Sequence, residues 1–426
     1  MFSTKADDTL IFTNCDDFID EVKDQNSKAV TGSFLDSLEP ARIAEIFASL
    51  AAKQRPKFQP TADPHQKIAI EDSIRHFTSN DRGQYISACG TGKTFTSFWI
   101  AQALKAKTIL YLVPSLALVK QTIGEWLKLS EAPFPFLSVC SDIKTARKRD
   151  TDELVITQSD LPFAVTTQPE QINDWVKATE NFDFRVVFAT YDSARAVAAG
   201  VGDDFKFELG FFDEAHKTAG TDGTKYNFGL YESNIRIAKR LFMTATPRFV
   251  DARSHRKDGE LKTLSMDDTE MYGERHHNFS FYEARKAGVI VPFKVHVSTI
   301  TSQDVNEYAR KTSSTEIHGD PIRSEQVARQ IALARAQADT GARKILTFHR
   351  KIEHAESFSS NRSEGIGPHL PNFFTSFVKG SQNVSVRDRI LRDFAQSENG
   401  LVSNARCLTE GVDVPEIDLI FFSTPK

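Results

Sequence analysis

Residues 87–94 read Ser-Ala-Cys-Gly-Thr-Gly-Lys-Thr, and this stretch decides the fold of the chain. The apolar run at 84–87 predicts a strand that leads into it, and the pattern at 94–106 predicts a helix that follows. Glycines in a turn between a strand and a helix let backbone N–H groups approach phosphate oxygens, and the helix N-terminus adds a positive dipole end. The stretch therefore predicts a phosphate-binding loop. The expected nucleotide contacts in it are Cys89, Gly90, Thr91, Gly92, Lys93 and Thr94.

Two side chains of this loop have chemical roles of their own. Lys93 is expected to reach the β- and γ-phosphates of the nucleotide, and Thr94 is expected to bind Mg²⁺. Ser87 departs from the general pattern, because it stands where such loops have their first glycine.

Two carboxylates follow a second apolar run, at 209–212. Asp213 is expected to hold Mg²⁺ through its water shell, while Glu214 orients and deprotonates the water that attacks the γ-phosphate. His216 completes the predicted catalytic group, and its expected part is to couple this site to a neighbouring motif. The sequence thus predicts ATP hydrolysis with Mg²⁺ as the metal.

Apolar runs of strand length alternate with helical patterns along most of the chain. The further runs of the first series lie at 108–113, 184–189 and 240–243, with helical patterns such as 94–106 and 116–129 between strands. A second series at 295–300, 344–348, 373–378 and 419–422 begins near residue 289. Continuous apolar runs are typical of parallel strands that are buried on both faces. We therefore predict an α/β protein with a helical N-terminal segment at 1–55, a first domain with the ATP site at 56–288 and a second at 289–426.

Further motifs follow in the order that DEAH-type helicases of superfamily two show, and the chain resembles this family from about residue 64 onward. The resemblance implies two tandem RecA-like domains with parallel sheets. It implies that residues at two strand ends touch the backbone of a nucleic acid, namely Pro114, Ser115, Thr190 and Tyr191. Thr244 and Thr246 are implied to couple the ATP site to the nucleic-acid groove.

Gln66 resembles the glutamine that recognises adenine in this family. Its side-chain amide can donate to the adenine edge and accept from it, which would favour ATP over other nucleotides. In the second half, His349 and Thr409 are implied to contact nucleic acid, and Gly411 and Asp413 to lie near the nucleotide.

The stretch at 271–294 resembles the linker of helicases that are related to restriction-enzyme motors. This favours a DNA translocase in restriction or phage defence, with duplex DNA and a nuclease or methylase as partners. The family's last motif, with its arginines, is expected shortly after 419–422, so the second domain is expected to be C-terminally incomplete and a C-terminal domain to be missing. Two alternatives remain open: an RNA helicase, and an ATP-dependent regulatory switch that controls a partner nuclease. A simple DNA-binding module is disfavoured by Lys93, Asp213 and Glu214.

Composition limits the class of partner and the compartment. The formal net charge of −4 excludes a uniformly basic surface, so nucleic acid must bind at a local groove or patch, for which the charged run at 144–149 is one candidate. The four cysteines form no CxxC pair, and no apolar run has the length of a membrane span. A cytoplasmic location without a membrane partner is expected. The 33 phenylalanines are expected to fill the cores.

Overall fold

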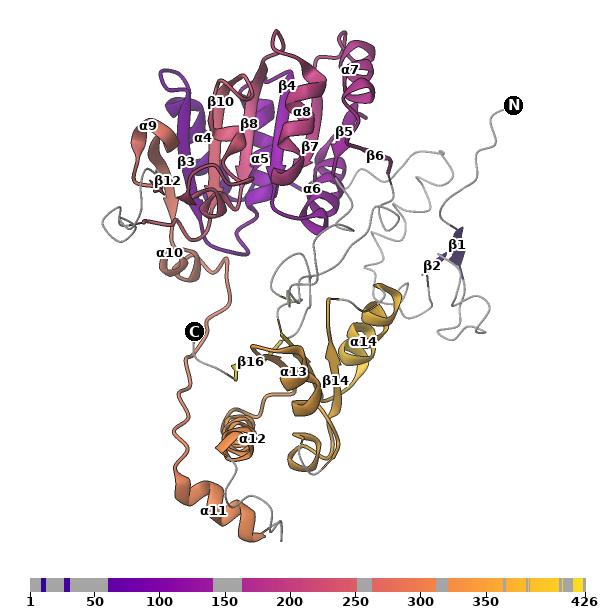
Figure 1. Ribbon diagram of the computed structural model, residues 1–426, viewed down its shortest axis with the longest axis vertical. Coiled ribbons are helices and arrows are strands. Elements are labelled where there is room, and N and C mark those ends of the chain that lie inside the picture. The colour runs from indigo at the N-terminus through magenta and orange to yellow at the C-terminus, as the bar shows by residue number, and fades with distance from the viewer. Residues whose placement is uncertain are drawn as a thin grey trace. The chain divides into compact units, whose positions relative to one another are not determined.

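The computed structural model describes residues 9–12, 27–30, 60–140, 163–250, 263–311, 321–362, 365–380, 384–405 and 417–423, together with Gln382 and Leu408. Its two larger sheets are both parallel, one with eight strands and one with four (Figure 1). Each sheet is described by itself. The predicted α/β class with parallel sheets is confirmed.

The first sheet carries the predicted phosphate-binding loop. Its strands, in sheet order, are β12 (Glu274–Phe279), β3 (Arg82–Ser87), β10 (Ile237–Thr244), β8 (Phe207–Asp213), β4 (Thr108–Val113), β7 (Arg185–Thr190), β5 (Phe136–Val139) and β6 (Val165–Thr166). The five strands predicted for this half are all present, with ends shifted by up to three residues. Because the strands are parallel, their carboxyl ends meet at one edge of the sheet, where loops that bind ligands gather.

Helices connect these strands and cover the sheet. They are α4 (Pro64–His76), α5 (Lys93–Ala103), α6 (Leu116–Leu129), α7 (Pro169–Ala178), α8 (Ala194–Val201), α9 (Thr269–Tyr272) and α10 (Phe281–Lys286), with short 3-10 turns η3 (Tyr191–Ser193), η4 (Ala215–Thr218) and η5 (Phe228–Leu230). A small antiparallel pair joins β9 (Gly220–Thr221) to β11 (Thr263–Leu264). All six positions of β4 and of β7 are buried, as expected of strands covered on both faces.

An aromatic cluster fills the core on one side of this sheet. Trp126 of α6 is fully buried among the rings of Phe98, Tyr111, Phe184, Phe188 and Phe211. Its indole N–H lies 3.2 Å from the carbonyl of Thr94, in the first turn of α5. The helix after β4 is therefore tied to the helix that follows the phosphate-binding loop.

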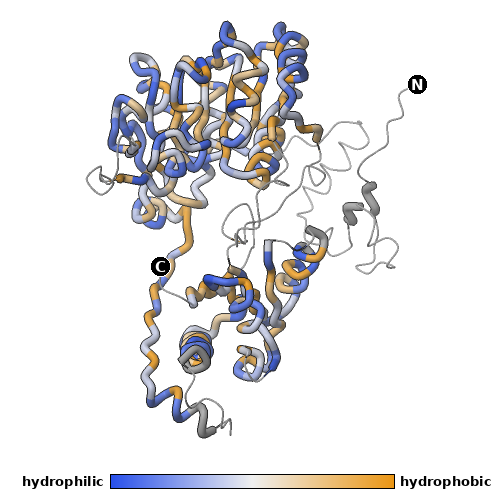
Figure 2. Tube along the Cα trace, in the orientation of Figure 1, coloured by the Kyte–Doolittle hydropathy of each residue, from blue (hydrophilic) through white to orange (hydrophobic). Residues whose placement is uncertain are grey.

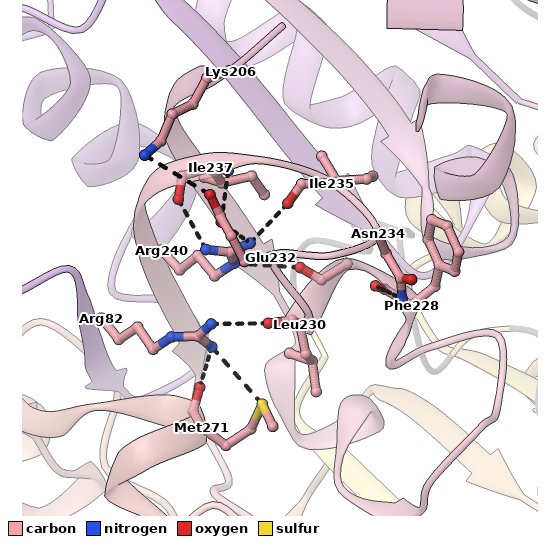
Figure 3. Close-up of polar contacts among 11 residues, drawn as sticks. Arg82, Lys206, Phe228, Leu230, Glu232, Asn234, Ile235, Ile237, Arg240 and Met271 are labelled. Carbon is pink, nitrogen blue, oxygen red and sulfur yellow. Dashed lines mark hydrogen bonds and ion pairs between the residues drawn. The ribbon is translucent and has the colours of Figure 1, made fainter. Parts of the chain in front are cut away.

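Two arginines brace the amino-terminal ends of β3 and β10, which are paired at Arg82 and Arg240 (Figure 3). Arg240 is 2% exposed and donates to the carbonyls of Ile237 and Ile235, both at 2.9 Å, while its other terminal contact is Glu232 at 2.9 Å. Arg82 donates to the carbonyls of Met271 and Leu230 at 2.6 and 3.0 Å. Burial lowers the pKa of both guanidinium groups, although both remain cations at neutral pH.

The segment that resembles a linker begins with a strand of the first sheet. Gly273 has φ +71°, and a Cβ there would lie 2.2 Å from the carbonyl oxygen of Arg82, so only glycine fits at the entry to β12. After β12, Ser280 and Glu283 cap α10 reciprocally. Residues 274–279 of this linker-like stretch pair in parallel with β3, so this part of it belongs to the first sheet.

Residues 291–300 are extended and belong to no strand, so the strand predicted at 295–300 is wrong. Hydrophobic and polar residues alternate along this segment, which is the strand pattern (Figure 2). Val295 and Val297 are nevertheless 80 and 83% exposed. Among the described residues no strand pairs with this segment. Alternation gives a segment the capacity for a strand, and a partner is needed to form one.

The second sheet has the order β14 (Phe374–Val378), β15 (Gly400–Asn404), β13 (Lys344–Phe348) and β16 (Leu419–Phe422). The helices of this half are α11 (Ser302–Lys311), α12 (Pro321–Thr340), α13 (Ile352–Phe358) and α14 (Val384–Gln396), with a 3-10 turn η7 (Gly367–His369). Lys344 of β13 donates to the carbonyls of Phe394, Ala395 and Ser397 at the end of α14, where a cation complements the helix dipole. The strands predicted at 344–348, 373–378 and 419–422 are confirmed.

Near the N-terminus the described residues form a parallel pair, β1 (Thr9–Phe12) with β2 (Ser27–Val30). The helical N-terminal segment predicted at 1–55 is thus wrong for residues 9–12 and 27–30, because the helical spacing of apolar residues that suggested it, at 18–22 and 38–50, lies outside both stretches. The rest of that segment, the charged run at 144–149, and Thr409, Gly411 and Asp413 lie outside the described residues. Within the described part of the chain, no helix has the length and apolar character to cross a membrane.

Candidate nucleotide site and adjoining strand ends

The loop after β3 has the backbone that phosphate binding needs. Gly90 and Gly92 have φ +78° and +77°, where other residues are strained, and a Cβ on Gly92 would meet the amide nitrogen of Gln66 at 2.4 Å. Helix α5 starts at Lys93, and no side chain caps its N-terminus. Its first N–H groups are therefore available to an anion.

Hydroxyl groups brace this loop from within. Thr91 Oγ1 donates to the carbonyl of Ala88 at 2.8 Å, so Ser87 Oγ donates to Thr91 Oγ1 at 2.6 Å. Ser87 is fully buried. The serine that replaces the usual first glycine thus has a structural part of its own. The Lys93 ammonium lies 3.2 and 3.4 Å from the carbonyls of Ser87 and Ala88.

Helix α4 holds the same loop from outside. The Gln66 amide donates to the carbonyls of Thr91 and Gly92 at 3.2 and 3.4 Å, and its oxygen accepts from the N–H of Asp63 at 2.9 Å. His65 bonds to the carbonyl of Thr91 at 3.0 Å. Both amide hydrogens of Gln66 are therefore used by the loop. Adenine recognition by Gln66 stays a prediction, to which the structure adds a contact with the loop.

His65 and Phe279 were not predicted as part of the site. Their rings stack with centroids 5.0 Å apart, and the N–H of Ala88 donates to the carbonyl of Phe279 at 3.0 Å. The end of β12 therefore forms a wall beside the loop. His65 could have been found from the sequence, because it directly precedes Gln66. Phe279 could not, because it reaches the loop only through the pairing of β12 with β3.

The two carboxylates follow β8 at the same edge of the sheet. Burial, reinforced by the charge of Glu214, raises the pKa of Asp213 to about 7, and the charge of Lys93 acts against this shift. Burial also raises the pKa of Glu214, but the hydrogen bond with His216 and the charge of Lys93 outweigh it and hold that pKa below its usual value. The charge of Lys93 therefore acts on both carboxylates, Asp213 and Glu214, and the charge of Glu214 also acts on Asp213.

His216 joins this group to the end of β10. Its Nδ1 lies 2.9 Å from Thr244 Oγ1 and 3.3 Å from a carboxylate oxygen of Glu214. The N–H of Thr246 donates to the same Thr244 hydroxyl at 3.2 Å. The structure thus brings together the residues predicted for hydrolysis and those predicted for coupling.

The residues of the first domain that are predicted to contact nucleic acid differ in how far their side chains are exposed. Pro114 and Ser115 are partly exposed at the end of β4, and Thr190 at the end of β7 is 7% exposed. Tyr191 is only 1% exposed, and its hydroxyl donates to the carbonyl of Asp213 at 2.8 Å. The side chain of Tyr191 therefore turns into the core in this conformation, and contact with nucleic acid at this strand end stays a prediction.

His349, the residue predicted to contact nucleic acid from the second sheet, also has a buried side chain. It is 4% exposed and lies between the hydroxyls of Thr347 and Ser423, each at 2.9 Å. Burial, followed by the charge of Arg329, lowers the pKa of His349 to about 3. The imidazole is therefore neutral and enclosed in this conformation, and its contact with nucleic acid stays a prediction. Asn404, at the end of β15, was not predicted as a site residue and donates to the carbonyl of Thr347 at 3.0 Å.

Known proteins that resemble this chain are restriction enzymes and helicases. Residues 59–249 match the family described as type III restriction enzyme, res subunit. A solved ATP-dependent Type ISP restriction-modification enzyme, LlaBIII bound to DNA, matches 98% of this chain with a TM-score of 0.73 and 26% identity. The chain resembles superfamily two helicases, and among them the motors of restriction enzymes. The predicted resemblance and the RecA-like fold are thereby confirmed.

Probable helicases of African swine fever virus are also similar. The proteins of the Pretoriuskop and Kenyan isolates are each 26% identical to this chain, over 367 and 369 residues and 85% of its length. The chain spans 37% of these relatives and 29% of the restriction enzyme. The similarity therefore concerns one part of larger proteins.

Proposed function

We propose that the chain is a nucleic-acid-dependent ATPase, a helicase or DNA translocase that acts in a restriction-type system. The observation that carries this proposal is the edge of the first sheet, where the loop of Lys93 meets the carboxylates of Asp213 and Glu214. His216 extends the same group to Thr244 on the next strand. Phosphate binding, hydrolysis and coupling side chains thus share one edge.

The arrangement suits ATP with Mg²⁺. The uncapped start of α5 and the Lys93 ammonium suit the phosphates, and the adjoining carboxylates of the buried Asp213 and the partly exposed Glu214 suit a divalent cation. Thr94 and Asp213 would hold Mg²⁺, which when bound neutralises charge on the phosphates. Glu214, held below its usual pKa, accepts a proton from the attacking water as the sequence Asp-Glu-Ala-His of a DEAH box requires.

Duplex DNA is the nucleic acid that we propose. The LlaBIII match, a restriction-modification enzyme bound to DNA, supports it. Pro114, Ser115 and Thr190 at adjacent strand ends are the proposed backbone contacts in the first domain, and Thr409 is proposed by resemblance alone. Contacts with phosphate and sugar would tolerate many sequences. A nuclease or methylase partner and a cytoplasmic location accompany the proposal.

The test is the ATPase rate of the chain without nucleic acid and with single-stranded DNA, duplex DNA and RNA. We expect duplex DNA to give the largest stimulation, because a motor couples each hydrolysis to a step along its track. Preferential stimulation by RNA would replace the DNA motor with an RNA helicase. Equal rates under all four conditions would contradict a motor and favour the regulatory switch. Glu214→Gln in parallel shows that the measured rate belongs to this site.

A further inference from the structure

The hydroxyl of Tyr191 contacts the peptide that joins the two predicted catalytic carboxylates. Its acceptor is the carbonyl of Asp213, at 2.8 Å, and the N–H of the same peptide, on Glu214, donates to Asp213 Oδ1 at 2.9 Å. Both polar groups of this peptide unit are therefore bonded. Its plane, and with it the direction in which the Glu214 side chain leaves the backbone, is fixed from two sides.

Glu214 needs such support because its backbone is strained. Its φ of +50° is left-handed, a conformation that residues with a Cβ adopt rarely. Such a conformation persists only when the surroundings hold it. The contacts of the Glu214 carboxylate with His216, and its interaction with Lys93, depend on this backbone geometry.

Tyr191 reaches this peptide from a distant strand end. It follows β7, whereas Asp213 ends β8, and β4 lies between them in the sheet. Neighbouring strands are about 4.8 Å apart, so the two strand ends are separated by roughly 10 Å. The side chain therefore spans the end of β4, where Pro114 and Ser115 are proposed to bind nucleic acid. Burial, reinforced by the charge of Asp213, raises the pKa of Tyr191 well above its usual value, so its hydroxyl remains a donor.

We propose that Tyr191 is a positioning residue for hydrolysis: by holding the Asp213–Glu214 peptide, it sets the catalytic carboxylate according to the position of the β7 end. The inference rests on the proposed function, because the β7 end matters to hydrolysis only if nucleic acid binds there. Thr190, the residue before Tyr191, donates to Ser193 at 3.1 Å, so the turn that carries the tyrosine is itself bonded. A shift of this turn would reach Glu214 through one hydrogen bond.

The test is Tyr191→Phe, which removes one buried hydroxyl and keeps the ring. The matched control is Tyr272→Phe, because Tyr272 is fully buried in the same domain and its hydroxyl bonds to Thr218 Oγ1 at 3.0 Å and not to the Asp213–Glu214 peptide. Steady-state ATPase kinetics, with and without saturating duplex DNA, and melting temperatures are measured for both variants and for the unaltered chain.

We expect Tyr191→Phe to lower kcat about tenfold and to leave KM for ATP within about twofold. A tenfold change in kcat corresponds to about 1.4 kcal/mol, which is the size expected for the loss of one hydrogen bond. The ratio of stimulated to basal rate should fall as well. Tyr272→Phe should keep kcat and that ratio, while both variants lose similar thermal stability.

The outcomes separate this inference from the proposed function. If the unaltered chain is stimulated by nucleic acid and Tyr191→Phe keeps the kcat of Tyr272→Phe, the positioning role is wrong and the proposed function stands. If no nucleic acid stimulates the chain but Tyr191→Phe still lowers kcat selectively, the motor is wrong and the positioning of Glu214 stands without its link to nucleic acid. A chain without any ATPase activity contradicts both.

Discussion

Replacing Arg240 by methionine tests the brace at the amino-terminal ends of β3 and β10. The guanidinium donates to the buried carbonyls of Ile237 and Ile235, both at 2.9 Å, and to that of Gly229 at 3.4 Å. Methionine fills a similar length and donates nothing. Glu232 loses one partner too, but it keeps Lys206 at 3.8 Å and the N–H of Ile237 at 3.1 Å, and its side chain is 47% exposed and can be hydrated.

The magnitude follows from the groups left without a donor. A buried carbonyl that loses its hydrogen bond costs about 1–3 kcal/mol. The two short bonds dominate, the 3.4 Å contact adds little, and relief from the neighbouring charge of Arg82 offsets part of the loss. We expect Arg240→Met to lower the free energy of unfolding by about 3 kcal/mol, and the melting temperature by roughly 6–12 °C for a domain of this size class.

Urea unfolding followed by circular dichroism measures this loss. The control is Lys107→Met, which removes an ion pair with Asp183 whose side chains are 59 and 90% exposed, and which should leave the unfolding midpoint unchanged. If Arg240→Met shifts the midpoint no more than Lys107→Met does, the guanidinium is not what holds the three carbonyls and the reasoning from burial fails.

Three further predictions concern the site and its surroundings. Lys93→Ala should abolish ATP binding and turnover, and a variant that still binds labelled ATP in a filter assay would overturn the phosphate-binding loop. Glu214→Gln should keep ATP binding but lower kcat by about 10²–10⁴-fold, as loss of a general base does; retained turnover in single-turnover assays would refute its role. Burial, followed by the charges of His76 and His277, lowers the pKa of His276 to about 3, below the ordinary value near 6.5. The neutral imidazole thus stabilises the fold above about pH 6.5, and this stability is lost as the pH falls. Urea unfolding should show a loss of at most about 2 kcal/mol between pH 7 and pH 5, smaller in His276→Asn, and equal pH dependence in both proteins would contradict it.

Sequence patterns predicted the central strands well, because a strand that is buried on both faces has apolar residues along most of its length. Strands β4 and β7 are continuous apolar runs, and each is buried at every position. The phosphate-binding loop was equally predictable, since its glycines, lysine and threonine are required at fixed spacing between a strand and a helix. For these elements the local sequence and the tertiary structure impose the same requirement.

The sequence of strand β12 has no such run of apolar residues. Its residues Glu-Arg-His-His-Asn-Phe are mostly polar, because it lies at the edge of the sheet and pairs only with β3. That pairing joins residues about 190 positions apart, such as Gln84 and Arg275, so nothing local specifies it. The opposite error arose at residues 295–300, where a strand pattern exists without a paired strand.

Side-chain direction at strand ends was the other limit. A motif places Tyr191 one residue beyond β7 and His349 one residue beyond β13, but it does not say whether each turns toward solvent or into the protein. Both turn inward, where the tyrosine hydroxyl finds the carbonyl of Asp213 and the imidazole finds the hydroxyls of Thr347 and Ser423. Buried polar groups must be paired, so these partners decide the direction.

Glu214 stands at the meeting point of the two routes that these contacts create. From one side, His216 ties it to Thr244 at the end of β10. From the other, Tyr191 holds its peptide from the end of β7, across the end of β4. The order β10, β8, β4, β7 makes these contacts possible, because it sets the carboxylate strand between the strands that carry the two partners. Nucleic acid at the ends of β4 and β7 would then act on the proposed general base without touching it. Because each route ends on a single hydrogen bond near Glu214, removing either bond should weaken the coupling of hydrolysis to nucleic acid before it weakens the binding of ATP.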